Sequence, residues 1–192
     1  ARKARVKKRL LEMAEGLIAL AAKRHLGEPP DIVLPEGSYH EFCARFPYQE
    51  TEDQERSIDD VLKDMHGNKA MDRLVCGDVG FGKTEVAMRA AFVAAMAGLQ
   101  VAVIVPTTLL SRQHFANFTA RFKGFPLRIA QLSRMVSTTE AQETRNQLAK
   151  GQVDIVIGTH ALLSDKVAFQ NLGLLIIDEE QNFGVKQKEK MK

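Results

Sequence analysis

The sequence predicts an α/β fold in which a parallel β-sheet is covered by helices on both faces. Strand-like and helix-like segments alternate from residue 72 onward, which is the order that parallel sheets require. Two of the strand-like runs, residues 101–105 (VAVIV) and 174–177 (LLII), are apolar throughout. A strand that is buried on both faces has this composition, whereas a strand with one hydrated face alternates. We therefore expect a three-layer sandwich.

The composition is that of a folded protein with a strongly basic start. The 192 residues are 45% hydrophobic and 27% charged, proportions that suit a globular domain with a buried core. The net charge is +3, and the first nine residues carry six positive charges, on Arg2, Lys3, Arg5, Lys7, Lys8 and Arg9. Such a run permits a polyanionic partner, but it is also typical of a solvated chain end.

Cysteine content and hydropathy indicate a cytoplasmic protein without membrane contact. Cys43 and Cys76 are too few for a disulfide framework, and Cys76 lies in an apolar run where we expect it to be buried. No apolar run approaches the roughly 18 residues that cross a membrane. The first residues are too polar for a signal peptide.

Helix and loop signals divide the chain into three regions. Residues 1–27 predict a linker helix, an N-terminal helical extension, because apolar side chains recur at helical spacing from Val6 to Leu20. Residues 28–45 contain several prolines and predict a linker with a short helical turn. Residues 46–192 form the main lobe. Both ends of the chain resemble cuts in a longer protein.

The main lobe begins with a helix and continues as an alternation of strands and helices. Thr51 and Gln54 have the spacing of a capping box, so a helix should begin there and end near residue 65. The expected strands cover residues 72–76, 100–105, 127–132, 153–157 and 174–177. The expected helices cover residues 83–97, 109–122 and 139–150, with a short helical segment near residue 161.

A phosphate-binding loop is predicted at residues 77–84 (GDVGFGKT), which match G-x-x-x-x-G-K-T between a predicted strand and a predicted helix. The glycines let successive backbone N–H groups face one point, and the following helix adds its positive end. Lys83 would reach the β- and γ-phosphates, and the Thr84 hydroxyl would hold Mg²⁺. A chance glycine-rich turn is the alternative. The expected nucleotide-binding residues are Gly77, Asp78, Val79, Gly80, Phe81, Gly82, Lys83, Thr84 and Glu85.

A second candidate motif follows the last predicted strand. Residues 174–177 deliver Asp178 and Glu179 to the carboxyl edge of the sheet, where α/β folds place their ligands. Asp178 would hold Mg²⁺, partly through water, and Glu179 would act as the general base for an attacking water. With Lys83 they form the predicted catalytic set. A solvated acidic loop is the alternative.

With these two motifs, the sequence from residue 46 onward resembles the motor of superfamily 2 helicases and translocases. The resemblance implies a RecA-like P-loop NTPase fold that uses ATP and Mg²⁺. Phe46, eight positions before Gln54, resembles the adenine-recognition motif of that superfamily. It implies that Gln54 pairs with the adenine edge while Phe46 stacks, although Gln54 is also explained as a helix-capping residue.

Three turns after predicted strands resemble the DNA-backbone contacts of the same superfamily. Hydroxyl side chains and helix N-terminal amides bind phosphates without reading sequence, as a translocating motor requires. Helix capping is the alternative role of these hydroxyl groups. The expected DNA-binding residues are Thr107, Thr108, Ser133, Arg134, Gly158, Thr159 and His160.

Within superfamily 2, the run from Met71 to Phe92 resembles the bacterial transcription-repair coupling factors. Phe81 and Glu180 favour this family over the related RecG-like branch-migration helicases, which usually have a small residue and Gln there. Both families usually continue with His and Arg, whereas this sequence has Gln181 and Asn182. The resemblance assigns coupling of ATP state to DNA contacts to Glu180 and Gln181, and the neutral pair puts the efficiency of that coupling in doubt.

The resemblance implies the first motor lobe of a double-stranded DNA translocase. Its parent protein would use ATP to displace stalled RNA polymerase and to recruit nucleotide excision repair, with those partners bound by domains outside this chain. The chain alone is expected to have little or no ATPase activity, because the resemblance implies a second lobe that completes the site. The alternatives are a RecG-like branch-migration helicase and a nucleotide-dependent binding switch.

Overall fold

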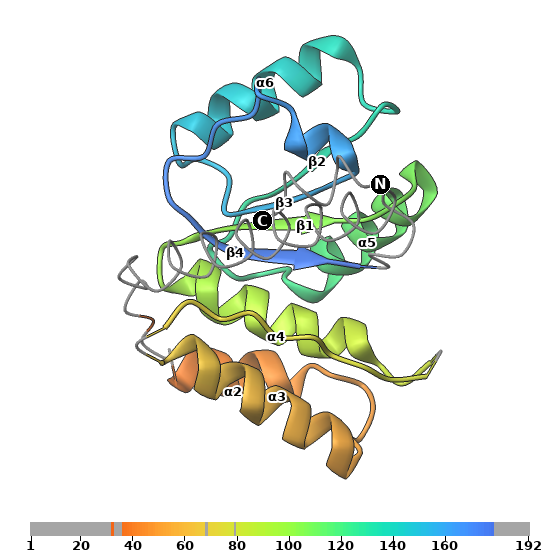
Figure 1. Ribbon diagram of the computed structural model, residues 1–192, viewed down its shortest axis with the longest axis vertical. Helices are drawn as coiled ribbons and strands as arrows, with labels where there is room; N and C mark the ends of the chain where they lie inside the picture. The colour runs from red at the N-terminus through yellow and green to blue at the C-terminus, as the bar shows by residue number, and fades with distance from the viewer. Residues whose placement is uncertain (1–31, 33–35, 68, 79, 179–192) are drawn as a thin grey trace, which may run out of the picture.

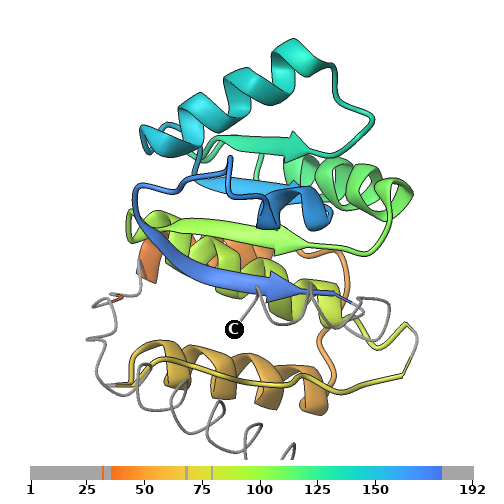
Figure 2. The same cartoon turned by 45° about the horizontal axis from the view of Figure 1, so that its top comes forward.

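The strands of the protein form a parallel sheet. The computed structural model describes residue 32 and residues 36–67, 69–78 and 80–178. Within these ranges the sheet has four strands in the spatial order β2-β3-β1-β4. Their bounds are Gln100–Ile104 for β1, Ile129–Leu132 for β2, Ile155–Gly158 for β3 and Leu172–Ile177 for β4. All neighbouring pairs are parallel, so the carboxyl ends of the strands lie at one edge, to the right in Figure 2.

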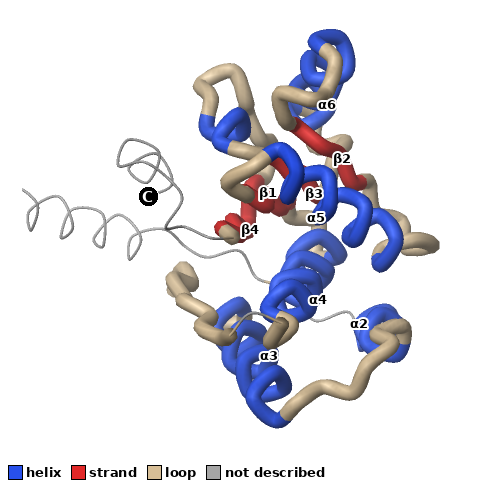
Figure 3. Tube along the Cα trace, turned by 90° about the vertical axis from the view of Figure 1, so that its right-hand side faces the viewer, coloured by secondary structure: helices blue, strands red, loops and turns tan. Residues whose placement is uncertain are grey.

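Helices cover both faces of this sheet, in the layers that its apolar strands require (Figure 1). Helices α4 and α5 pack on one face, whereas α6 and the short 3₁₀ helix η1 pack on the other. Helices α2 and α3 lie on the outer side of α4 (Figure 3). The bounds are Glu36–Ala44 for α2, Glu52–Met65 for α3, Lys83–Met96 for α4, Thr108–Arg121 for α5, Thr138–Ala149 for α6 and His160–Leu163 for η1. The predicted parallel α/β sandwich is confirmed.

The apolar run of β1 is explained by the two hydrophobic clusters that it separates. All five residues of β1 are buried. Val101 and Val103 belong to the cluster with α4 and α5, while Ala102 and Ile104 belong to the cluster with α6. Because successive side chains of a strand point to opposite faces, a central strand needs apolar residues at every position.

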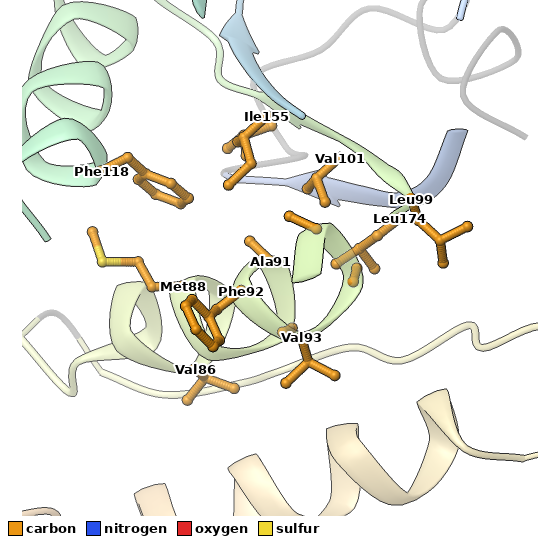
Figure 4. Packing of buried hydrophobic residues seen from close by; sticks show 14 of the residues in the cluster. Val86, Met88, Ala91, Phe92, Val93, Leu99, Val101, Phe118, Ile155 and Leu174 are labelled. Carbon is orange, nitrogen blue, oxygen red and sulfur yellow. The ribbon is translucent and has the colours of Figure 1, made fainter. Parts of the chain in front are cut away.

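Helix α4 runs through the middle of the molecule and is buried nearly all round. Ala91 and Phe92 are both 0% exposed. In Figure 4, Ala91 points toward the sheet, whereas Val86 and Val93 point away from it toward the outer helices. Neither α4 nor any other described helix combines the length and the hydrophobicity needed to cross a lipid bilayer. The loop that precedes α4 is therefore attached to the most firmly packed helix of the lobe.

Helix α2 packs into the lobe, in a region where the sequence predicted a linker followed by a short helical turn. Phe42 is 0% exposed, and its ring stacks on Phe92 with the centroids 4.3 Å apart. The rings of Phe122 and Phe42 meet edge to face, with their centroids 4.9 Å apart. Residues 36–44 thus contribute an aromatic anchor to the main core. The helix predicted over residues 2–26 lies outside the described residues.

The strand predicted at residues 72–76 is wrong. This segment is extended but pairs with no strand among the described residues, and Leu74 is 81% exposed. Cys76 is exposed as well, contrary to the burial expected for it. Met71 and Val75 pack against the main core, and Arg73 binds carboxylates of α3. A short apolar run cannot distinguish a sheet strand from an extended segment that lies on helices.

Candidate nucleotide-binding site

The phosphate loop, residues 77–84, leads into α4 at the end of the molecule toward which the strand arrows point (Figure 2). Gly80 and Gly82 have φ angles of 85° and 80°, in the left-handed region that favours glycine. Gly82 is the N-cap residue of α4. Left-handed residues at alternate positions of a loop turn successive backbone N–H groups toward one point. The result is a concavity that suits anions. Val79 lies outside the described residues.

Lys83 lies over its own loop. Its Nζ donates hydrogen bonds to the carbonyl oxygens of Gly77, at 2.5 Å, and Asp78, at 2.8 Å. The ammonium group therefore sits at the mouth of the loop that precedes the positive end of α4. A charged phosphate oxygen is a stronger acceptor than a carbonyl oxygen, so an ammonium group in this position suits a phosphate ligand. Thr84 follows in the first turn and is partly exposed.

Gln54 connects α3 to the phosphate loop. Its side-chain oxygen accepts a hydrogen bond from the backbone N–H of Thr51 at 2.9 Å, and the predicted capping box is confirmed. Its side-chain amide donates to the carbonyl oxygen of Phe81. The sequence predicted the first contact from spacing, but nothing in it indicated the second, which joins residues 27 positions apart. Helix capping and contact with the phosphate loop therefore coexist in one residue.

Phe46 lies at the start of the adenine segment, which we define as residues 46–54. Its ring meets Tyr48 edge to face at 5.6 Å and is partly buried. The guanidinium carbons of Arg89 and Arg121 are each 5.9 Å from the ring centroid, at the outer limit of cation–π attraction. Both predicted adenine residues thus lie near the start of α4. Gln54 is hydrogen-bonded to Phe81, just before the helix, and Phe46 faces Arg89 in its second turn.

A buried ion cluster joins these elements. The Glu85 carboxylate accepts hydrogen bonds from Arg89 and Arg121, both at 2.9 Å, and Arg89 also pairs with Glu50. Burial alone would lower the pKa of Arg89, but its hydrogen bonds with the two glutamates raise that pKa. The hydrogen bond from Arg89 holds the pKa of Glu50 below its usual value. The four-residue spacing on a helix could have revealed the Glu85–Arg89 pair, but the other two members are distant in sequence.

Asp178 follows β4 at the carboxyl edge of the sheet. Its backbone N–H donates to the carbonyl oxygen of Ile104 at 2.9 Å, so strand pairing sets its position. Its Oδ2 lies 3.1 Å from Nε2 of His114, a residue of α5 that sequence reasoning missed. A carboxylate and the Thr84 hydroxyl are the oxygen ligands that Mg²⁺ prefers. The structure brings Asp178 and the phosphate loop to the same end of the molecule, whereas Glu179, Glu180 and Gln181 lie outside the described residues.

The predicted DNA-binding residues fall into three turns at the carboxyl edge of the sheet. Thr107 caps α5 and accepts a hydrogen bond from the N–H of Leu110 at 3.2 Å. Thr108, the first residue of α5, is partly exposed. The hydrogen bond to Leu110 confirms the capping role of Thr107. Both residues follow β1, and their exposed surface remains available to a ligand.

The other two turns follow β2 and β3 and meet each other. The Arg134 guanidinium nitrogen Nη2 lies 3.3 Å from Nε2 of His160. Ser133 and Thr159 are only 5% and 2% exposed, and their hydroxyl groups accept hydrogen bonds within their own turns. A side chain at Gly158 would come within 2.3 Å of a backbone oxygen of β2, so close packing explains this glycine.

Comparison with protein families defines the class of this lobe. A model of the family described as DEAD/DEAH box helicase matches residues 51–192. The match covers the adenine segment from Thr51 onward, the phosphate loop and the acidic end of β4. The chain belongs to the DEAD/DEAH box helicase family.

Comparison with individual proteins identifies relatives within this family. Transcription-repair-coupling factors from Rickettsia conorii and Bacillus subtilis are 53% and 52% identical to this chain over 99% of its length. The chain spans 17% and 16% of those two proteins. The resemblance to the transcription-repair coupling factors that the motifs predicted is confirmed.

Solved structures agree with this fold. RecG bound to a three-way DNA junction superposes with a TM-score of 0.80 and 37% identity over 91% of this chain and 24% of that one. A hypothetical ATP-dependent RNA helicase from Sulfolobus tokodaii gives a TM-score of 0.58 at 19% identity, over 76% of this chain and 41% of that one. The second likeness concerns the fold alone.

Proposed function

We propose that this chain is the ATP-binding first motor lobe of a superfamily 2 double-stranded DNA translocase. The observation that carries the proposal is the convergence of two predicted motifs on one helix terminus. Lys83 lies over the phosphate loop, and Gln54 of the adenine segment bonds to Phe81 in the same loop. The relatives in Rickettsia conorii and Bacillus subtilis are named transcription-repair-coupling factors, which supports a role in coupling transcription to repair. We extend this proposal to a cytoplasmic parent protein that would displace stalled RNA polymerase and recruit nucleotide excision repair.

The ATP site would work through charge placement. The loop amides and Lys83 would hold the β- and γ-phosphates and offset the charge that develops during phosphoryl transfer. Thr84 and Asp178 would hold Mg²⁺, partly through water, and the metal would supply further charge neutralisation. Glu179 would accept the proton of the attacking water. Phe46 and Gln54 would select adenine.

DNA contact would involve the three turns at the carboxyl edge of the sheet. Thr107, Thr108, Arg134 and His160 are exposed or partly exposed and could offer side chains to backbone phosphates. The buried Ser133 and Thr159, with Gly158, could contribute backbone N–H groups only. Such contacts read no sequence, so binding should weaken steeply with salt and vary little among DNA sequences.

The sharpest test uses Glu179→Gln in a protein that carries this lobe with the rest of its motor. Removing the general base should abolish DNA-stimulated ATP hydrolysis and displacement of a stalled polymerase, while Mg²⁺·ATP binding persists. Persistent displacement that depends on DNA length would contradict a motor and would favour a nucleotide-dependent binding switch.

A RecG-like branch-migration helicase is the second candidate, favoured by the TM-score of 0.80 with the junction-bound RecG structure. The two candidates differ in substrate. A coupling factor should displace a stalled polymerase and leave a three-way junction largely unprocessed, whereas a branch-migration helicase should do the reverse. Measuring both reactions with the same preparation separates them.

A further inference from the structure

A largely buried cluster of four charged side chains, which joins the adenine segment to α4 and α5, has no role in the function proposed above. It consists of Glu50, Glu85, Arg89 and Arg121, whose side chains are 23%, 6%, 8% and 10% exposed. Two negative and two positive charges balance, so the cluster is neutral as a whole. Buried charges are costly to hold unless they are paired, and such groups often serve geometry more than stability.

Arg89 is the member that bridges two functional segments. Its Nε donates to Glu85, two residues after Lys83, while its Nη2 donates to Glu50 in the adenine segment. Its guanidinium carbon also lies 5.9 Å from the centroid of the Phe46 ring. The rigid planar fork of arginine holds two carboxylates in fixed directions, whereas the rotatable ammonium group of lysine does not impose such a geometry.

Arg121 fixes the other side of this bridge. Its Nη2 donates to Glu85 at 2.9 Å and its Nη1 to the carbonyl oxygen of Phe42 at 2.5 Å. Its guanidinium carbon lies 4.0 Å from the centroid of the Phe42 ring. Glu85 is thus held from α5 as well as from α4, so the carboxylate that orients Arg89 has little freedom to turn away.

We propose that Arg89 is a positioning residue for adenine, which holds Glu50 and Phe46 at a set distance from the phosphate loop. The inference rests on the proposed ATP function and adds the source of its base selectivity. When the adenine segment is already in place, a nucleotide need not order it on binding, and the base contributes its full contact energy. Loss of the bridge should weaken the base contact and leave the phosphate contacts unchanged.

The test compares ligands with and without adenine. Mg²⁺·ATP, Mg²⁺·GTP and magnesium tripolyphosphate are titrated calorimetrically into the 192-residue chain, as wild type and as Glu50→Gln and Arg89→Lys. Glu55→Gln is the matched control, because it makes the same change at an exposed position of α3 just outside the adenine segment. Melting temperatures verify folding, and if Arg89→Lys does not fold, Glu50→Gln carries the test.

The expected result is a loss of about tenfold in the preference for ATP over GTP in both variants, the size of one weakened charged hydrogen bond. Tripolyphosphate affinity should not change, and the Glu55→Gln control should keep the wild-type preference. An unchanged preference, or an equal loss for all three ligands, would overturn the positioning role alone. A wild-type chain without preference for ATP would instead contradict the adenine contact itself, and the positioning role with it.

Discussion

The two halves of the candidate ATP site are held in very different ways. The adenine segment is joined to α4 by the Glu50–Arg89 ion pair, and α4 is joined to α5 by Glu85 and Arg121. The phosphate loop is held mainly by the hydrogen bonds of Lys83 to its own carbonyls and by the bond from Gln54 to Phe81. The segment that leads into it exposes Leu74 and Cys76.

This difference indicates which half of the site has its binding geometry before a nucleotide binds. The adenine half rests on buried charges and aromatic rings, which fix geometry without a ligand. In the phosphate half, the loop N–H groups and the Lys83 ammonium group reach their binding positions only when a triphosphate binds. Changes on the adenine side should therefore affect folding, and changes on the phosphate side should affect mainly ligand binding and chemistry.

The largest effect is expected at the centre of the buried cluster. Glu85→Ala leaves two arginines facing each other without their shared partner, and should lower the free energy of unfolding by about 3–5 kcal/mol. Urea unfolding measures the loss. Glu143→Ala, an exposed glutamate of α6, is the control and should change stability by about 0.5 kcal/mol or less. Equal losses in both variants would show that the cluster does not hold the lobe together.

Lys83→Ala tests the phosphate half. It should lower ATP hydrolysis about 10²- to 10³-fold in a protein that carries the complete motor, the usual effect of removing one charge-stabilising group. The melting temperature should stay nearly constant, because the hydrogen bonds of the Lys83 ammonium group with described residues are to carbonyls of its own loop. A large fall in melting temperature would show that the loop supports the fold and would remove the contrast between the two halves.

A pair of glycine substitutions tests the joint between the halves. Gly80→Ala and Gly82→Ala both place a side chain at positive φ, which costs about 1–2 kcal/mol. Only at Gly82 does the new carbon meet a neighbour, Nε2 of Gln54, at 2.4 Å, whereas Gly80 has open space. Gly82→Ala should therefore cost about 1 kcal/mol more in urea unfolding. Identical losses would mean that the Gln54 contact contributes nothing.

The smallest effect concerns acid pH. The hydrogen bond from Arg89 lowers the pKa of Glu50 in the folded state from its ordinary value of 4.5. A depressed carboxylate pKa stabilises the fold above the unfolded value, and this contribution is lost as pH falls through the folded value. The stability gap between wild type and Glu50→Gln should therefore shrink below about pH 4.5. A gap that widens in acid would contradict the sign of this shift.

Local patterns predicted much of the fold from the sequence. Unbroken apolar runs predicted the strands β1 and β4, and Thr51 with Gln54 predicted the start of α3. Burial on both faces was correct for β1 only, because β4 is at the edge of the described sheet and only its Leu174 is buried. These signals reside in neighbouring residues, where periodicity and capping act directly. The run at residues 72–76 failed because its apolar residues pack on helices, an arrangement that sequence spacing does not encode.

The sequence predicted the local motifs of the candidate site, but it did not predict the long-range side-chain contacts that join them. The phosphate loop and Gln54 were recognised by pattern, since backbone chemistry fixes their spacing. His114 beside Asp178, and Arg121 beside Glu85, were not, because each pair joins residues brought together only by the packing of α5. Such long-range polar contacts depend on tertiary structure and leave no periodic trace in the sequence.

The most direct test of the account is hydrogen exchange of the chain with and without saturating Mg²⁺·ATP. Amides of the phosphate loop, residues 77–84, should become protected by about tenfold or more on ATP addition, because their N–H groups bind phosphate oxygens. The second half of α4, already buried, should show no change. Unchanged exchange in the loop at saturating ATP would contradict the central claim that this loop binds the triphosphate.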